Sequence, residues 1–247
     1  MGVKATQFEF RFRLFIILLI YMLGFWAPWT WANGRYGPPP TTAWLAIPTM
    51  VERWGWLRLD QATLVVTGLA ILFGFVGAVL RVWGTAYLSP SIVHSAAMHG
   101  DEVTAAGPYR YVRNPLYLGS WFLGLSIAIL MPPSGALIFG GLLALFYFRL
   151  ILGEEDFLAK QIGEGYLEYK RRVPRLVPSL GARVPRPPAQ PEWAWSVVAE
   201  FLPVSYPVCL SALAWRYEPR LLVRCLLICF GLSLVMRAFL PKRQPGA

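Results

Sequence analysis

Charged side chains are scarce in this chain of 247 residues, where they make up 15% of the sequence, against about 25% in an ordinary soluble domain. Hydrophobic residues make up 56%, which is more apolar surface than a soluble globule of this size can cover. A disordered chain has the opposite composition. The scarcity of charge therefore excludes both classes and predicts an integral membrane protein of the all-α class.

Metal-binding side chains are also few. The three cysteines lie in apolar C-terminal segments, and no CxxC pair is present. His94 and His99 are the only histidines, and they do not have the spacing of zinc ligands. The sequence therefore predicts no metal site.

Acidic residues are outnumbered, with 13 Asp and Glu against 23 Lys and Arg, for a net charge of +10. In a soluble protein this excess would suggest a nucleic-acid partner. No basic helix with interleaved aromatic residues supports that reading, whereas basic loops on the cytoplasmic side of a bilayer explain the charge directly. We expect contact with the membrane and none with nucleic acid, and no obligate protein partner is evident.

Long windows without charge locate the membrane spans, because a charge at mid-bilayer costs roughly 2.5–3.5 kcal/mol on the insertion scale. The windows are 14–34, 61–80 and 114–148, the last broken by a Pro132-Pro133 turn into a hairpin, with weaker candidates at 196–215 and 221–240. We therefore predict a polytopic helical bundle of about five to six transmembrane helices. Residues 37–56 are expected to form an interfacial loop with a helical turn. Within the weaker pair, Glu200 and Arg237 fall at matching depth and are expected to form an ion pair.

Lys and Arg concentrate in loops on one side of this predicted topology. The positive-inside rule then places both termini and both long polar loops in the cytoplasm. We expect a multi-pass protein of the bacterial inner membrane. The sequence divides into four predicted parts: N-terminal helices at 1–100, a polar-hairpin region at 101–178, a Pro/Arg linker at 179–193 and a C-terminal hairpin at 194–247.

Two polar stretches, 107–117 and 154–178, flank the predicted hairpin 114–148, so the hairpin brings them together. They contain adjacent carboxylates, tyrosines and arginines. Tyrosine faces attract a sulfonium or ammonium cation, and arginine fixes carboxylate or phosphate. Glu154, Leu158 and Gln161 are expected to share a helix face. Positive-inside sorting and interfacial anchoring would explain the same residues without a binding site.

The order of these residues resembles the signature of the isoprenylcysteine carboxyl methyltransferase family and its phospholipid-methyltransferase relatives. The family pattern is roughly G-x-Y-x-x-x-R-H-P-x-Y, a short hairpin, E-E-x-x-L, F-G-x-x-Y-x-x-Y and a V-P tail. The matching residues are Gly107, Tyr109, Arg113, Pro115, Tyr117, Glu154, Glu155, Leu158, Gly163, Tyr166, Tyr169, Val173 and Pro174. The resemblance covers residues 101–178.

The resemblance implies that S-adenosylmethionine (SAM) binds on the cytoplasmic side and that a lipophilic substrate enters from the bilayer. Carried over by position, the SAM contacts are Val103, Thr104, Tyr109, Asn114, Pro115, Leu116, Tyr117 and Glu154, with Tyr166 and Tyr169 closing the site. Glu155 is a candidate base for an amine acceptor. Arg149 and Arg113 are candidates for holding an anionic headgroup.

Two departures from the family pattern concern chemistry. Asn114 stands where the family often has histidine, and an amide does not titrate. Leu150 stands where the prenylcysteine carboxyl methyltransferases have an arginine, and Arg149 is about 100° away around the helix. A lipid amine, a small thiol and a prenylated carboxylate all remain open as acceptors. An NADPH-dependent reductase of the sterol-reductase type and a non-catalytic membrane scaffold are the alternative functions.

Overall fold

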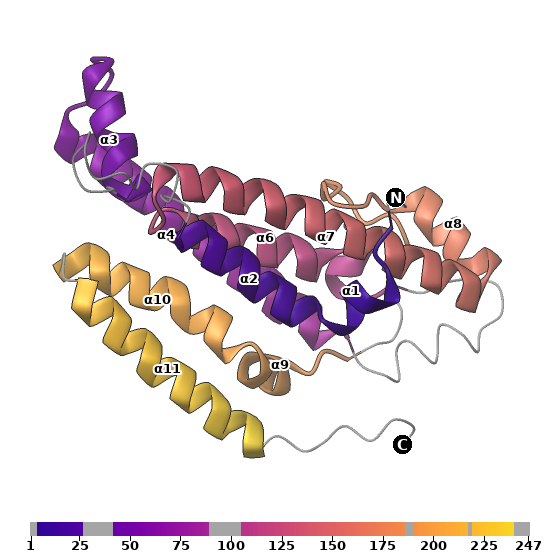
Figure 1. The fold of residues 1–247 in the computed structure, drawn as a ribbon. Helices are drawn as coiled ribbons and strands as arrows, with labels where there is room; N and C mark the ends of the chain where they lie inside the picture. Colours follow the sequence, from indigo (N-terminus) through magenta and orange to yellow (C-terminus); the bar gives the residue numbers. More distant parts are fainter. Residues whose placement is uncertain (1–3, 27–41, 89–104, 186–189, 217–218, 240–247) are drawn as a thin grey trace. The chain divides into compact units, whose positions relative to one another are not determined.

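A computed structural model of the protein describes residues 4–26, 42–88, 105–185, 190–216 and 219–239. All regular structure within these ranges is helical, without a strand (Figure 1). The predicted all-α class is therefore confirmed.

The helices follow the predicted windows closely. They are α1 (Gln7–Arg11), α2 (Arg13–Trp26), α3 (Ala43–Arg53), α4 (Leu59–Ala86), the 3-10 helix η2 (Gly107–Arg110), α6 (Pro115–Ala128), α7 (Pro133–Ile162), α8 (Glu164–Arg172), α9 (Trp193–Ala199), α10 (Phe201–Arg216) and α11 (Pro219–Phe239). The predicted break at Pro132-Pro133 separates α6 from α7, and Pro133 begins α7, where a missing N–H costs nothing. Residues 42–56 contain more helix than the single turn expected there.

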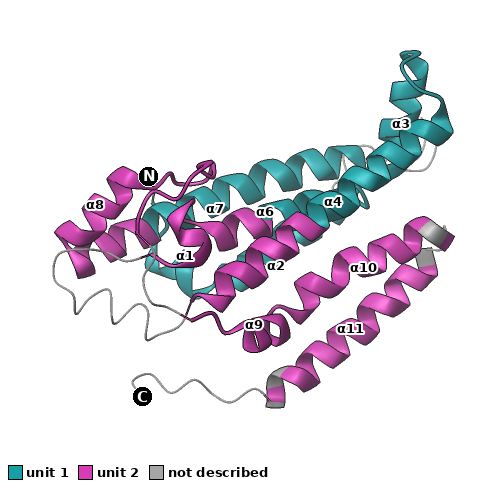
Figure 2. Cartoon of the chain, turned by 180° about the vertical axis from the view of Figure 1, so that it is seen from behind, with its two compact units in different colours: residues 1–74, 121–153 teal, residues 75–120, 154–247 magenta. Residues whose placement is uncertain are grey.

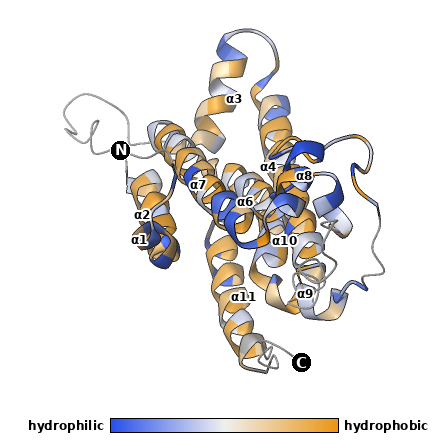
Figure 3. Cartoon of the chain, turned by 90° about the vertical axis from the view of Figure 1, so that its right-hand side faces the viewer, coloured by the Kyte–Doolittle hydropathy of each residue, from blue (hydrophilic) through white to orange (hydrophobic). Residues whose placement is uncertain are grey.

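Two helices in the described part of the chain, α4 and α7, are long and apolar enough to cross a membrane. The bent pair α9–α10, with a 66° bend, would add a third if it forms one span, and α2 and α6 are shorter apolar helices. In Figure 3 the long helices are mostly hydrophobic and α8 is mostly hydrophilic. The membrane character is thus supported, and the count of five to six spans stays a prediction.

The chain forms two compact units (Figure 2). The first contains residues 1–74 and 121–153, and the second contains residues 75–120 and 154–247. These boundaries differ from the four parts proposed above. The division into four parts stays a prediction.

In the first unit, α1 is fastened to α7. Thr6 and Glu9 form a capping box at the start of α1, which satisfies backbone N–H groups that have no partner within the helix. The backbone N–H of Ala5 donates to the carbonyl of Arg149 at 3.0 Å. The Arg149 guanidinium binds the Glu9 carboxylate with an Nη2–Oε2 distance of 2.9 Å. The indole N–H of Trp44 donates to the Thr67 hydroxyl at 2.7 Å and joins α3 to α4.

In the second unit, α8 packs against the segment that contains η2. Gly163 separates α7 from α8 with a φ of 76°, a left-handed conformation that glycine adopts without strain. The chain therefore turns sharply, and α8 buries Tyr166 and Tyr169. These rings form an apolar cluster with Ala105 and Val184.

Glu200 has a partner that the sequence did not predict. Its carboxylate binds Arg81 of α4, with Nε–Oε2 and Nη2–Oε1 distances of 2.6 and 2.9 Å. The expected partner, Arg237, has a side chain that lies outside what the structure describes. The buried carboxylate is thus neutralised by α4, which an antiparallel-hairpin argument alone did not indicate.

Candidate functional site

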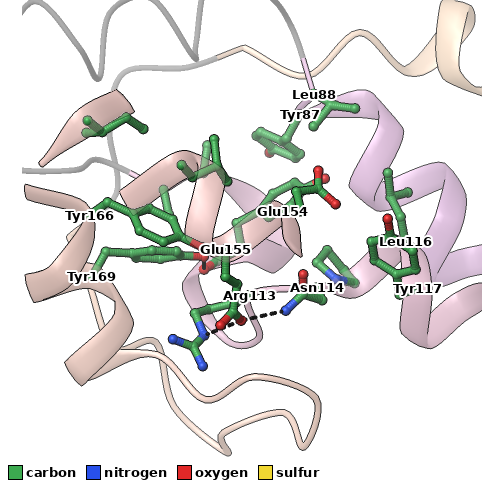
Figure 4. Close-up of a pocket in the computed structure, with 16 residues that line it drawn as sticks. Tyr87, Leu88, Arg113, Asn114, Leu116, Tyr117, Glu154, Glu155, Tyr166 and Tyr169 are labelled. Atoms are coloured by element: carbon green, nitrogen blue, oxygen red, sulfur yellow. Dashed lines mark hydrogen bonds and ion pairs between the residues drawn. The ribbon is translucent and has the colours of Figure 1, made fainter. Parts of the chain in front are cut away.

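A cavity in the second unit gathers residues from five segments of the chain (Figure 4). Its wall is formed by the end of α4, the η2 segment, the start of α6, the end of α7 and α8. The lining residues are Tyr87, Leu88, Ala105, Ala106, Tyr109, Arg113, Asn114, Pro115, Leu116, Tyr117, Glu154, Glu155, Leu158, Ile162, Tyr166 and Tyr169. The two polar stretches singled out in the sequence therefore lie around one cavity.

Local backbone rules explain how these residues reach the cavity. Pro115 begins α6, so the turn before it carries Arg113 and Asn114 to the wall. Gly107 has a φ of 55°, and a Cβ atom there would overlap the ring of Tyr87. Glycine at this position therefore lets η2 approach the end of α4 closely.

Glu155 is a buried carboxylate at the centre of a charged cluster. Its side chain is 2% exposed and binds Arg175 with an Nη2–Oε2 distance of 2.9 Å. Asn114 donates its side-chain amide to Oε1 at 3.2 Å, and the Nε of Arg113 lies 3.4 Å from the same oxygen. The Nζ of Lys170 lies 3.9 Å from the other carboxylate oxygen, Oε2. A buried charge needs such partners, so this cluster joins α7, α8 and the turn before α6.

Glu154 is placed differently although it is the neighbouring residue. Consecutive helical residues point about 100° apart, and Figure 4 shows the Glu154 carboxylate on the side of Tyr87, away from the Glu155 cluster. No hydrogen bond or ion pair to Glu154 is found among the described residues. Its carboxylate is therefore the acceptor that this part of the cavity offers to a ligand.

The tyrosines contribute neutral hydroxyl groups and aromatic faces. Burial raises the pKa of Tyr166 to about 12, with the negative charge of Glu155 adding to the shift. Burial also raises the pKa of Tyr109, and the charge of Glu154 acts in the same direction. The Tyr109 hydroxyl is buried and has no hydrogen-bond partner within the described ranges. A buried unsatisfied hydroxyl is costly, so a ligand atom in the cavity would stabilise it.

Tyr169 has a supporting contact in addition to its place in the wall. Its hydroxyl donates to the backbone carbonyl of Tyr109 at 2.9 Å, and its ring lies 5.8 Å from that of Tyr166. The two tyrosines expected to close the site therefore form one wall of it and hold η2 against α8.

Most of the predicted site residues come together in this cavity. Those that line it are Tyr109, Arg113, Asn114, Pro115, Leu116, Tyr117, Glu154, Glu155, Tyr166 and Tyr169. Val103 and Thr104 lie outside the described residues.

Arg149, Arg113 and Glu155 form contacts with other protein groups that their expected roles did not include. Arg149 binds Glu9 and is absent from the lining residues. Arg113 lines the cavity, but its Nη1 donates to the carbonyl of Lys170 at 3.1 Å and its Nε faces Glu155. Glu155 already accepts from Arg175 and Asn114. The geometry therefore favours positioning roles over anion binding for these arginines and over proton transfer for Glu155.

Several lining residues were missed in the sequence. Ile162 lies on the cavity face, whereas Gln161, expected there, is exposed. Glu154, Leu158 and Ile162 are spaced four residues apart and therefore share one helix face. The sequence thus contained the information that predicts Ile162 at the cavity. In the sequence, Tyr87 cannot be distinguished from an aromatic residue that anchors the end of a membrane span. Only the fold shows that it enters the wall.

The described residues contain no group of three or more His, Cys, Asp or Glu side chains that could hold a metal ion. The residues that line the cavity include one carboxylate (Glu154) and one hydroxyl (Tyr109) without partners among the described residues, together with several aromatic rings. This donor set suits an organic ligand with hydrogen-bond donors and a cationic centre.

Comparisons with known proteins find similarity to methyltransferases. Residues 62–165 match the phospholipid methyltransferase family. A methanethiol S-methyltransferase from Crocosphaera subtropica is 37% identical over 75 residues, which is 30% of this chain and 29% of that protein. A protein-S-isoprenylcysteine O-methyltransferase from Dictyostelium discoideum is 32% identical over 125 residues, covering 43% of this chain and 49% of the relative.

A protein-S-isoprenylcysteine O-methyltransferase B from Arabidopsis thaliana is 26% identical over 136 residues, or 53% of this chain and 64% of that protein. The chain thus spans less than two thirds of each of these relatives. No solved structure gives a significant match. The family match includes all of α6 and α7, nearly all of α4, and the carboxylate pair of the cavity. Residues 62–165 of this chain are thus similar to the phospholipid methyltransferase family.

Proposed function

We propose that this protein is an integral membrane methyltransferase that uses SAM and acts on a lipophilic acceptor. The observation that carries the proposal is the cavity that Glu154 and Tyr109 both line, because neither the Glu154 carboxylate nor the buried Tyr109 hydroxyl has a partner among the described residues. The family match covers the helices that supply much of this wall.

The residues present fit the chemical groups of SAM. Glu154 would accept hydrogen bonds from its ammonium or ribose hydroxyl groups, and Tyr109 would donate to one of its oxygens. The rings of Tyr87, Tyr117 and Tyr166 would surround a cationic sulfonium. When bound, SAM supplies a methyl group activated by this sulfonium centre.

The remaining residues would keep the site dry and rigid. Leu88, Leu116, Leu158 and Ile162 give the wall an apolar part, which excludes water and strengthens electrostatic contacts inside the cavity. The Glu155 cluster holds the turn 113–117 against α7 and α8. Rigid support of this kind keeps two bound reactants aligned, which supplies much of the acceleration of a displacement reaction.

The position of the cavity along the helices supports a lipophilic acceptor. Tyr87 directly follows α4, and Glu154 is in the last third of α7, so the cavity is lined near the ends of both candidate spans. An acceptor that partitions into the bilayer would reach this level without crossing bulk water. The density of Lys and Arg in the neighbouring loops supports a cytoplasmic position for this end.

The test measures SAM binding and methyl transfer by the purified full-length protein. Calorimetry with SAM is expected to give saturable binding. The Glu154→Gln variant should bind about tenfold to a hundredfold more weakly, because a hydrogen bond to a charged group is lost. Glu164→Gln is the matched control, since that carboxylate is 84% exposed and does not line the cavity.

Radiolabelled methyl transfer then identifies the acceptor. The relatives' names include a thiol and an isoprenylcysteine, so the acceptors offered are an alkanethiol, an S-prenylated cysteine and a total lipid extract containing phosphatidylethanolamine. Label in any one of them supports the proposal. Binding of NADPH without SAM would favour the reductase, and absence of both would favour a scaffold.

A further inference from the structure

The segment that contains α9 lies beyond the matched domain, yet it contacts the last turn of α4 beside the cavity. We propose that Trp193 and Glu200 are positioning residues, which act through Tyr87 and Arg81 to hold the cavity wall in its binding geometry. This inference rests on the function proposed above. It assigns a role to the C-terminal hairpin that the family match leaves out.

The first contact is the buried carboxylate of Glu200. It accepts hydrogen bonds from Arg81 at 2.6 and 2.9 Å and from the Thr85 hydroxyl at 2.8 Å. Glu200 is 7% exposed, so removing it would leave the Arg81 guanidinium without its counter-charge in an apolar helix. Arg81 and Thr85 lie one turn apart and fix the last part of α4.

The Arg81 contact continues into the cavity wall. Arg81 also donates to the Ser120 hydroxyl, and Ser120 donates to the carbonyl of Leu116 at 2.8 Å. Leu116 lines the cavity, and a Cβ atom at Gly84 would lie 2.8 Å from its side chain. Glu200 is therefore connected to the first turn of α6 through hydrogen bonds between neighbouring side chains.

The second contact is made at Tyr87. The Trp193 ring meets the Tyr87 ring edge-on, with centroids 6.2 Å apart. The backbone N–H of Glu192 donates to the Ala86 carbonyl at 3.0 Å and thereby satisfies a carbonyl left without a partner at the end of α4. On its other side, the Tyr87 ring packs over Gly107. Tyr87 is thus confined between η2 and the C-terminal segment.

A double-mutant cycle separates positioning from general support. Trp193→Ala is expected to weaken SAM binding about fivefold when Tyr87 is present. In a Tyr87→Ala background the same substitution should have no further effect, because the ring through which Trp193 acts is gone. Equal weakening in both backgrounds would overturn the inference. Trp56→Ala, at a tryptophan that is 71% exposed after α3, is the matched control and should leave affinity unchanged.

Glu200→Gln tests the second route. It should raise the KM for SAM several-fold while kcat at saturating SAM changes little, and Glu164→Gln should change neither. If Glu200→Gln does not fold, the Trp193 cycle still decides. A wild-type protein that fails to bind SAM contradicts the proposed function. A wild-type protein that binds SAM with the same affinity as Trp193→Ala contradicts only the present inference.

Discussion

The two adjacent carboxylates of α7 show how much one residue's position decides. Glu155 points into Arg175, Arg113 and Asn114, whereas Glu154 faces the cavity. Both are acidic and both were placed at the site from the sequence. Only the partners supplied by the turn before α6, α8 and the segment after α8 distinguish the paired carboxylate of Glu155 from the carboxylate of Glu154, which has no such partners among the described residues.

Glu155→Gln is predicted to destabilise the protein strongly. The substitution removes the charge that balances Arg113 and Arg175 in a buried site, and breaking such a pair costs about 3–5 kcal/mol. Thermal unfolding in detergent measures the effect. Glu154→Gln, which removes a carboxylate without ion-pair partners among the described residues, serves as the control. Equal unfolding temperatures for the two variants would contradict the assignment.

The junction of α1 and α7 is the clearest case in which one element is fastened to another by charge. The Arg149 hydrogen bonds lower the pKa of Glu9 from 4.5 to about 2, helped by the backbone N–H of Thr6. Because the folded-state pKa is depressed, the ion pair contributes stability above the unfolded pKa. That contribution is lost as the pH falls from about 4.5 toward 2.

Glu9→Gln is therefore predicted to lower stability near neutral pH by less than about 1 kcal/mol, since the pair is partly exposed. The difference between wild type and Glu9→Gln should shrink as the pH is lowered through this window. Thermal unfolding midpoints of both proteins, measured across this pH range, test the predicted decrease in the difference. A difference that stays constant down to the most acidic pH would rule out the Glu9 carboxylate as its source.

At the level of the secondary-structure elements, the sequence predicted the positions of the helices better than it predicted the contacts between them. The Pro132-Pro133 pair and the charge-free windows predicted the α6–α7 break and the long apolar part of α4, because backbone chemistry and the cost of a charge in lipid act locally. The pairing of Glu200 was not predicted. A search restricted to the C-terminal hairpin left out α4, 119 residues away along the chain.

For the whole molecule, the distribution of Lys and Arg predicts which face lies in the cytoplasm. A cysteine introduced by Leu180→Cys, at a fully exposed position of the predicted cytoplasmic loop, should be protected from a membrane-impermeant maleimide in intact cells. Arg58→Cys, with a side chain that is 80% exposed, should be labelled. Both variants are compared with the parent protein, which carries only its three native cysteines. The reverse labelling pattern would invert the topology.

The sequence by itself determined the membrane class, the helical windows and most residues of the candidate site. These features depend on local composition, helix-breaking residues and the order of a family signature. The tertiary structure decided which charges pair: Arg149 with Glu9, Glu155 with Arg175, and Glu200 with Arg81. Ion pairs between distant residues depend on which helix ends meet, and a short-range sequence pattern does not contain that information.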